Sequence, residues 1–215
     1  ISYNHVDEKG IFLGNNFKQD NARAKLRMSK YIFDVDANIA FKVTDSQGTK
    51  FSLKEMYMIS PLVPIYDETR EYGFGLTDFD GLPNNRNVMA DHHYKSAWGK
   101  SYHTTANIGL TVNFTDWLSF KTSYAYRGEH SRGGYHNPPY ISDSRSPVKY
   151  PSSGANSSYW EEQIIDNVIN FNKDFGRHSI NAMLGSSITQ QKNDWNGVGV
   201  EGKKTNHKVV DGEMV

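Results

Sequence analysis

Strict alternation of apolar and polar residues in residues 105–128 is the feature that most constrains the fold. Every second residue from 106 to 114 is apolar, and the residues between them are Asn, Gly or Thr. The pattern resumes after residues 115–117, with Leu118, Phe120, Tyr124 and Tyr126 on one face. Because successive side chains of a strand point to opposite faces, this pattern predicts a hairpin of two long strands, each with one apolar face.

The same alternation predicts about seven strands in an antiparallel up-and-down meander. Their expected bounds are 1–6, 17–28, 31–43, 105–114, 118–127, 159–173 and 179–190. Most of these segments are about as long as the 9–11 residues with which a tilted strand crosses a bilayer, or slightly longer. The fold class is therefore all-β, and the apolar faces meet either a protein core or lipid.

The predicted connections fall into two classes that alternate along the chain. Short turns are expected at 29–30, 115–117 and 174–177, whereas long loops are expected at 44–102 and 128–158. Alternate connections of a meander emerge at opposite ends, so one end has tight turns and the other has long loops. Outer-membrane barrels show this asymmetry. Within the first long loop, Ser52 and Glu55 have capping-box spacing and predict one short helical turn.

Composition fits a strand-built membrane protein better than it fits a helical one. Apolar residues make up only 37%, although there are 13 Tyr and 11 Phe. A membrane barrel needs apolar residues at alternate positions only. No run of about 18 apolar residues predicts a transmembrane helix. A formal net charge of zero argues against nucleic acid as a partner. Seven strands is an odd number, which suggests a section of a larger barrel.

Five stretches of the chain resemble, in order, parts of the SusC/RagA-type TonB-dependent outer-membrane transporters. They are YNHVDEKGIFLGNNFKQDNARAKL, YMISPLVPIYDETREYGFG, LPNNRNVMADHHYK, NFTDWLSFKTSYAYRG and YWEEQIIDNVINFNKDFGRHSINAMLGSSI. The resemblance covers essentially the whole chain. It implies that residues 1–215 are a section of a transmembrane β-barrel of 22 strands, with long extracellular loops. The plug, the TonB box and the C-terminal strands of that family have no counterpart in this sequence.

The resemblance also implies partners and cargo. Family members act with a SusD-like surface lipoprotein, draw energy from TonB through parts that this segment lacks, and sit in outer-membrane lipid. Their cargo is an oligosaccharide or a peptide. The competing interpretation is a soluble or surface-exposed β-rich sugar-binding module or adhesin. Such a module would stay monomeric without detergent, whereas a barrel section would expose too much apolar surface to do so.

Two sets of residues are candidates for contact with cargo. Aromatic rings at the long-loop end could stack on sugars, or they could pack the loops and the partner together. The candidates are Tyr66, Tyr72, Trp98, Tyr135, Tyr140 and Trp195. A basic row could line the lumen, or it could pair with Asp34 and Asp36 across the hairpin. Its members are Arg23, Lys25 and Arg27, with Lys121 on the same kind of face in a later strand.

Motifs that would indicate other chemistry are weak. GVGVEG at 197–202 has the glycine spacing of a dinucleotide loop, but no helical pattern follows it. Histidines such as His130 and His136 are expected to be loop residues rather than metal ligands. Ser, His and Asp occur without a G-x-S-x-G elbow. We therefore expect no catalytic residues, no metal and no cofactor.

Overall fold

The computed structural model describes residues 1–78, 86–202, 209–210 and 213–214. Two predicted regions lie partly outside the described residues. They are residues 82–85, which begin the third stretch that resembles the transporter family, and residues 203–204, in the loop predicted after the last strand. The described chain is dominated by one seven-stranded sheet in the order β1-β2-β3-β4-β5-β6-β7, so every neighbour in the sheet is a neighbour in sequence. All six pairings are antiparallel, which confirms the predicted meander.

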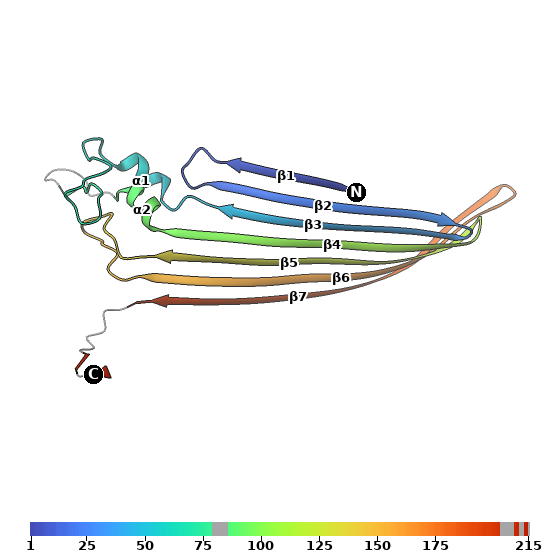
Figure 1. Cartoon of the computed structure of the whole chain (residues 1–215). Coiled ribbons are helices and arrows are strands. Elements are labelled where there is room, and N and C mark those ends of the chain that lie inside the picture. The colour runs from blue at the N-terminus through green and yellow to red at the C-terminus, as the bar shows by residue number, and fades with distance from the viewer. Residues whose placement is uncertain (79–85, 203–208, 211–212, 215) are drawn as a thin grey trace.

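The strands lengthen along the chain. Their bounds are Ser2–Lys9 for β1, Asn16–Lys30 for β2, Phe33–Gln47 for β3, Ser96–Thr115 for β4, Leu118–Asn137 for β5, Ser152–Phe175 for β6 and His178–Glu201 for β7. Two short strands, Val209–Val210 and Glu213–Met214, pair as β8 and β9. Figure 1 shows the seven long strands running side by side.

The ends of the sheet differ, as the sequence predicted. Two-residue turns join β2 to β3, β4 to β5 and β6 to β7 at one end, which we call the tight-turn end. The turn after β2 is Tyr31–Ile32 rather than 29–30, and Tyr31 takes a positive φ of 56° there. Gly176, with φ of 65°, makes the turn after β6, where a residue without Cβ adopts this conformation at low cost.

The predicted boundaries at the other end, the long-loop end, are wrong. The strands continue well into the stretches expected to be loops, so the loops shrink to 48–95 and 138–151. The first loop contains two helices, α1 at Leu53–Met58 and α2 at Val88–Tyr94. Helix α1 is the predicted helical turn, although Ser52 caps it without a side-chain hydrogen bond. Helix α2 was not predicted.

Buried apolar residues lie in the loops and not on the sheet. Among the described residues they are Val63, Phe74, Leu76, Val88, Ala90 and Tyr140. We call this packed unit of residues 48–78, 86–95 and 138–151 the loop cap, and Figure 1 shows it at the long-loop end. The sheet is a single layer with both faces uncovered in the described chain. Its apolar face therefore needs a covering that these residues do not supply.

Candidate functional site

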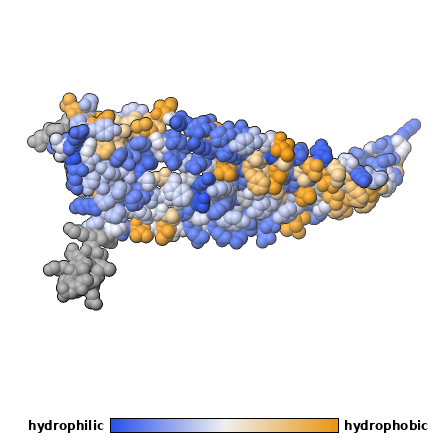
Figure 2. All heavy atoms as spheres, viewed as in Figure 1, coloured by the Kyte–Doolittle hydropathy of each residue, from blue (hydrophilic) through white to orange (hydrophobic). Residues whose placement is uncertain are grey.

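One face of the sheet carries a continuous uncharged zone, which we call the apolar band. It consists of every second residue at 22–28 in β2, 33–43 in β3, 102–112 in β4, 118–128 in β5, 163–171 in β6 and 180–190 in β7. The register aligns these residues into rows, for example Leu26, Ala37, Ile108, Tyr124 and Ile165. On the side seen in Figure 2, apolar side chains gather toward the tight-turn end.

Charged residues limit the apolar band on both sides. Toward the long-loop end, the first charged residues on this face form what we call the charge boundary, one per strand: Asp20, Asp45, Lys100, Arg132, Glu161 and Lys192. Toward the tight-turn end stand Lys30 and Lys173, and the Lys173 amine lies 4.1 Å from the centre of the Trp117 ring. Two polar side chains in the middle of the band pair with each other, since Thr122 donates to Asn167 over 2.8 Å.

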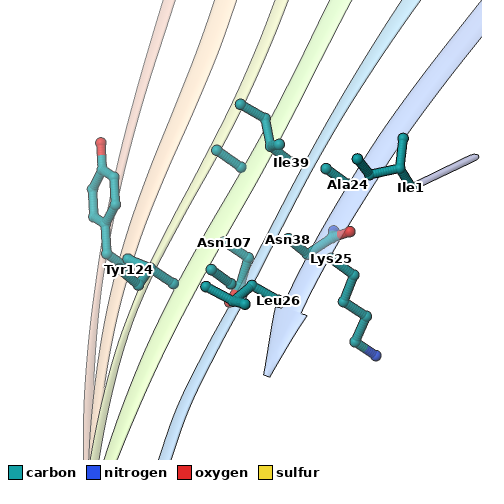
Figure 3. A pocket seen from close by; sticks show the side chains of 11 residues that line it. Ile1, Ala24, Lys25, Leu26, Asn38, Ile39, Asn107 and Tyr124 are labelled. Atoms are coloured by element: carbon teal, nitrogen blue, oxygen red, sulfur yellow. The ribbon is translucent and has the colours of Figure 1, made fainter. Parts of the chain in front are cut away.

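A shallow hollow of about 450 Å³ opens in the middle of the apolar band. Small side chains on three neighbouring strands leave this space, and Leu26, Ile39, Ile108 and Tyr124 surround it. In Figure 3 the amine of Lys25 extends away from these apolar groups. Because side chains alternate along a strand, the Lys25 amine lies on the other face of the sheet, although the neighbouring Ala24 and Leu26 line the hollow.

The opposite face, which we call the polar face, carries the predicted basic row. Arg23, Lys25 and Arg27 follow one another on β2, and they line a depression of about 440 Å³ together with Asp36 and Arg127. Among the described residues, none of these three cations forms an ion pair with a carboxylate. Arg27 is nevertheless the direct register partner of Asp36, so pairing of the row with Asp34 and Asp36 stays an alternative to lining the lumen.

Other carboxylates of the polar face already have partners. Asp34 accepts a hydrogen bond of 2.7 Å from Asn113. Glu162, which is 9% exposed, accepts from Arg127 over 3.1 Å and from Gln191 over 2.8 Å. Lys121 lies on this face in a separate depression, beside Asp166. All four predicted basic residues therefore share one face, and the β2 row keeps free donors for an anion or for hydroxyl groups.

A buried carboxylate organises the loop cap. Asp91 of α2 is 1% exposed and accepts hydrogen bonds from Tyr140 and, over 3.0 Å, from Ser142. Its second oxygen pairs with Lys95 at 3.1 Å, and Arg86 lies 3.6 Å away. Burial and the Asp91 carboxylate raise the pKa of Tyr140. Residues from both long loops thus meet at one buried carboxylate. Its Oδ1 accepts both hydrogen bonds, whereas its Oδ2 has the ion pair with Lys95 but no hydrogen-bond partner among the described residues.

Asn87 fixes the start of α2 and ties it to the rest of the cap. Its side-chain oxygen accepts from the amides of Met89 and Ala90, as an N-cap residue does. Its amide nitrogen donates to the carbonyls of Ile65 and Gly75 over 3.0 and 2.9 Å. Asn before an apolar run is the signal from which sequence could have predicted this helix.

The predicted aromatic residues fall into three environments. Tyr140 is wholly buried and stacks on Tyr94 with 5.1 Å between ring centres, so it packs the cap. Tyr72 is half-buried and meets Tyr94 edge-on. Tyr66 packs on Phe74 at 5.4 Å but remains 63% exposed. Of these three, Tyr66 has the most surface free for a ligand.

Trp98, Tyr135 and Trp195 lie on strands β4, β5 and β7 and not in loops, so the prediction of their surroundings is wrong. Each ring lies over a glycine: Gly134 beside Trp98, Gly154 beside Tyr135 and Gly197 beside Trp195. An aromatic ring of this kind covers backbone that a glycine leaves bare. The rings are still 48%, 45% and 68% exposed, so one side of each is open to solvent.

The segment 67–78 of the cap is expected to loosen in acid. Thr69 donates twice to Asp67, and Arg70 binds Asp78 with two hydrogen bonds of 2.7 and 2.9 Å. These contacts lower the pKa of Asp67 and of Asp78. A lowered pKa stabilises the fold above the unfolded value of about 3.9, and this contribution is lost as pH falls through the folded value. The protection factor of the Gly73 amide, which donates to Arg70, should fall below about pH 4 when its exchange is compared with that of an unstructured peptide at the same pH.

The matched control for that acid response is Asp67→Asn combined with Asp78→Asn. The double variant lacks the two carboxylates that accept these hydrogen bonds, so the protection factor of the Gly73 amide should be lower already at neutral pH and should change little on acidification. An unchanged acid response in the double variant would assign the loosening to other groups.

No helix in the described part of the chain is long and apolar enough to span a membrane. Among the same residues no group of His, Asp and Glu is arranged to hold a metal ion. GVGVEG runs along β7 into the residue after it, so Gly197 and Gly199 lie in an extended strand and not in the turn that a nucleotide loop requires.

Comparison with known proteins gives a match in structure only. No protein-family model and no curated protein matches the sequence. A chain of the RagAB peptide importer in its closed-closed state superposes with a TM-score of 0.70, at 12% identity over 95% of this chain and 23% of that chain. The open-open state gives a TM-score of 0.69, at 13% identity over 95% of this chain and 23% of that chain. The chain thus has the fold of a section of those importer chains, and spans less than a quarter of their length.

Proposed function

We propose that this chain is a section of the wall and extracellular loops of a transmembrane β-barrel, in an outer-membrane importer of the SusC/RagA TonB-dependent type. The apolar band faces lipid, the polar face lines the lumen, and the loop cap stands outside the membrane. Cargo is an oligosaccharide or a peptide, taken up with a SusD-like surface lipoprotein. TonB acts through parts of the importer beyond these strands.

The apolar band is the observation that carries this proposal. On β4 it runs from Tyr102 to Val112, which is roughly 34 Å along a strand at about 3.4 Å per residue. A strand tilted by about 45° would cover roughly 24 Å of membrane thickness, close to the apolar height of known barrels. Lipid can cover such a face without any further protein layer. The limited thickness of the hydrocarbon also accounts for the charged residues at which the band ends on both sides.

The polar face supports a role in transport without covalent chemistry. It presents unpaired Arg23, Lys25 and Arg27, together with Asn and Thr side chains, around the depression on β2 to β5. Such donors bind carboxylates and hydroxyl groups reversibly. Cargo held between the loop cap and the lipoprotein partner would pass along this face after the importer opens.

The test uses the full-length protein that contains this segment, detected with an antibody to the segment. We expect it in the outer-membrane fraction, with heat-modifiable mobility on gels, and we expect a surface lipoprotein to co-purify in detergent. A soluble species that needs no detergent would contradict the barrel wall and favour the sugar-binding module. Cargo is then assigned by measuring binding of peptide and glycan libraries to the purified complex.

A glutamine triple variant, Arg23→Gln with Lys25→Gln and Arg27→Gln, tests the polar face in the same complex. If the row contacts cargo, binding of anionic cargo should fall about tenfold while neutral cargo is little affected, because each lost pair removes a charge-assisted hydrogen bond. The control is Lys30→Gln, which removes a cation from the other face of the same strand. Equal effects of the triple variant and the control would contradict a role in cargo contact.

A further inference from the structure

Two cations face each other across β4 and β5, and among the described residues no carboxylate forms an ion pair with either of them. Lys100 and Arg132 are direct register partners on the face of the apolar band. Like charges placed opposite one another on paired strands destabilise a sheet. Among the described residues neither cation forms an ion pair, whereas Lys18 and Lys192 on the same face pair with Asp7 and Asp194 at 3.0 Å each.

Tyr102 holds the two cations in place. The Lys100 amine lies 5.7 Å from the centre of the Tyr102 ring, and the Arg132 guanidinium lies 5.6 Å from it. Arg132 also donates to the Tyr102 hydroxyl over 3.1 Å. Cation–π contacts with Tyr102 thus fix the two positive charges beside one another.

The nearby carboxylates do not bind this pair directly, although the charge of Lys100 acts on Asp20. Asp45 is the register partner of Lys100 on β3 but forms no ion pair with it. Asp20, farther along this face, is engaged by Tyr3 at 2.5 Å and by His5 at 2.7 Å. The Arg132 guanidinium and the Lys100 ammonium therefore keep N–H groups free to donate. Proteins use these two groups to bind phosphate.

The pair stands where the apolar band ends. Lys100 and Arg132 belong to the charge boundary, and Tyr102 is the last uncharged residue of the band on β4. A ligand bound here would have its anion against the two cations and its apolar part along the band. Those are the two parts of a phosphorylated membrane lipid, with the headgroup at the interface and the acyl chains in the hydrocarbon.

We propose that Lys100 and Arg132, positioned by Tyr102, bind the phosphate group of a membrane lipid on the outside of the barrel wall. This proposal rests on the proposed function, because it requires the apolar band to face lipid. Under this proposal, the charge boundary does more than end the apolar band: at Lys100 and Arg132 it binds anionic lipid headgroups selectively.

The experiment uses the full-length importer in nanodiscs of phosphatidylcholine with a minor share of phosphatidic acid. Native mass spectrometry counts the phosphatidic acid that the protein retains. Lys100→Gln with Arg132→Gln should retain about fivefold less than the unaltered protein, because both charge-assisted contacts are removed. The matched control, Lys18→Gln with Lys192→Gln, makes the same change of charge on the same face and should retain the normal amount.

Each other outcome counts against the proposal. Equal retention by both double variants would mean that the cations give only general attraction. Displacement of the lipid by millimolar inorganic phosphate would assign the site to a free anion. Loss of a co-purifying protein with normal lipid retention would assign the pair to a protein partner. Failure of the proposed function is distinguishable, since the unaltered protein would then not enter nanodiscs at all.

Discussion

Replacing Ile108 by lysine is expected to prevent most of the full-length protein from reaching its folded, membrane-embedded form. Ile108 lies in the middle of the apolar band and is 53% exposed. A lysine facing lipid at mid-membrane costs about 2–4 kcal/mol. In a soluble protein, the same change at a half-exposed position would alter stability by only about 0.5 kcal/mol. The fraction of protein with folded, heat-modifiable gel mobility measures the effect directly.

Ser123→Lys is the matched control for Ile108→Lys. Ser123 lies on the polar face of the neighbouring strand and is the register partner of Asp166. A lysine there adds the same charge beside a carboxylate, so the folded fraction should stay near that of the unaltered protein. If the two variants folded equally well, the apolar band would not face lipid.

Replacing Asp91 by alanine is expected to disorganise the loop cap while leaving the sheet intact. The change leaves Lys95 without its carboxylate and removes the acceptor of the buried Tyr140 and Ser142 hydroxyls. Removing one partner of a buried ion pair costs about 3–5 kcal/mol. Limited proteolysis of the purified full-length protein should then cut within 48–95 or 138–151 under conditions that leave the unaltered protein whole.

Glu55→Gln supplies the comparison for Asp91→Ala. Glu55 is the other carboxylate near Arg86, at 3.8 Å, but its side chain is 36% exposed. Its loss should cost less than about 1 kcal/mol, the usual value for exposed pairs. Equal protease sensitivity in the two variants would show that the cap does not depend on its buried carboxylate. Continued heat-modifiable mobility of Asp91→Ala would confirm that the sheet folds independently of the cap.

Alternation predicted the sheet well wherever one face is apolar. The hairpin at 105–128 and the strand order follow from a period of two, because a shift of one residue would put a whole apolar row on the polar side. In the sequence of strand β6 the apolar face is hard to identify, because Asp166 and Asn167 interrupt the apolar run. The structure resolves this: Asp166 lies on the polar face and accepts from Ser187, and Asn167 pairs with Thr122 within the band.

The strands beyond the charge boundary could not be predicted from the same signal. We call these parts, residues 96–99, 133–137, 152–160 and 193–201, the collar. Both faces of the collar are mixed in polarity, so no alternation marks them. Glycines such as Gly134 and Gly154 suggested loops, but an aromatic ring from the neighbouring strand covers each one. That cross-strand partner is visible only once the register is known.

The sequence predicted which residues share a face of the sheet, but it did not predict the contacts that hold the loop cap together. The four basic residues share one face, as alternation required. The burial of Tyr140 and its bond to Asp91 join residues 49 positions apart in the chain. No local pattern reports such a contact, because it depends on how two long loops fold over each other.

The collar also determines where this chain can change in length. Within the apolar band, inserting one residue would turn every later side chain of that strand to the opposite face, which a lipid-facing wall does not tolerate. In the collar both faces carry polar and glycine residues. An insertion there would exchange the residues of the two faces, but each face would still be compatible with water. Insertions and deletions should therefore accumulate above the charge boundary, leaving a wall of constant height beneath a rim whose height varies freely.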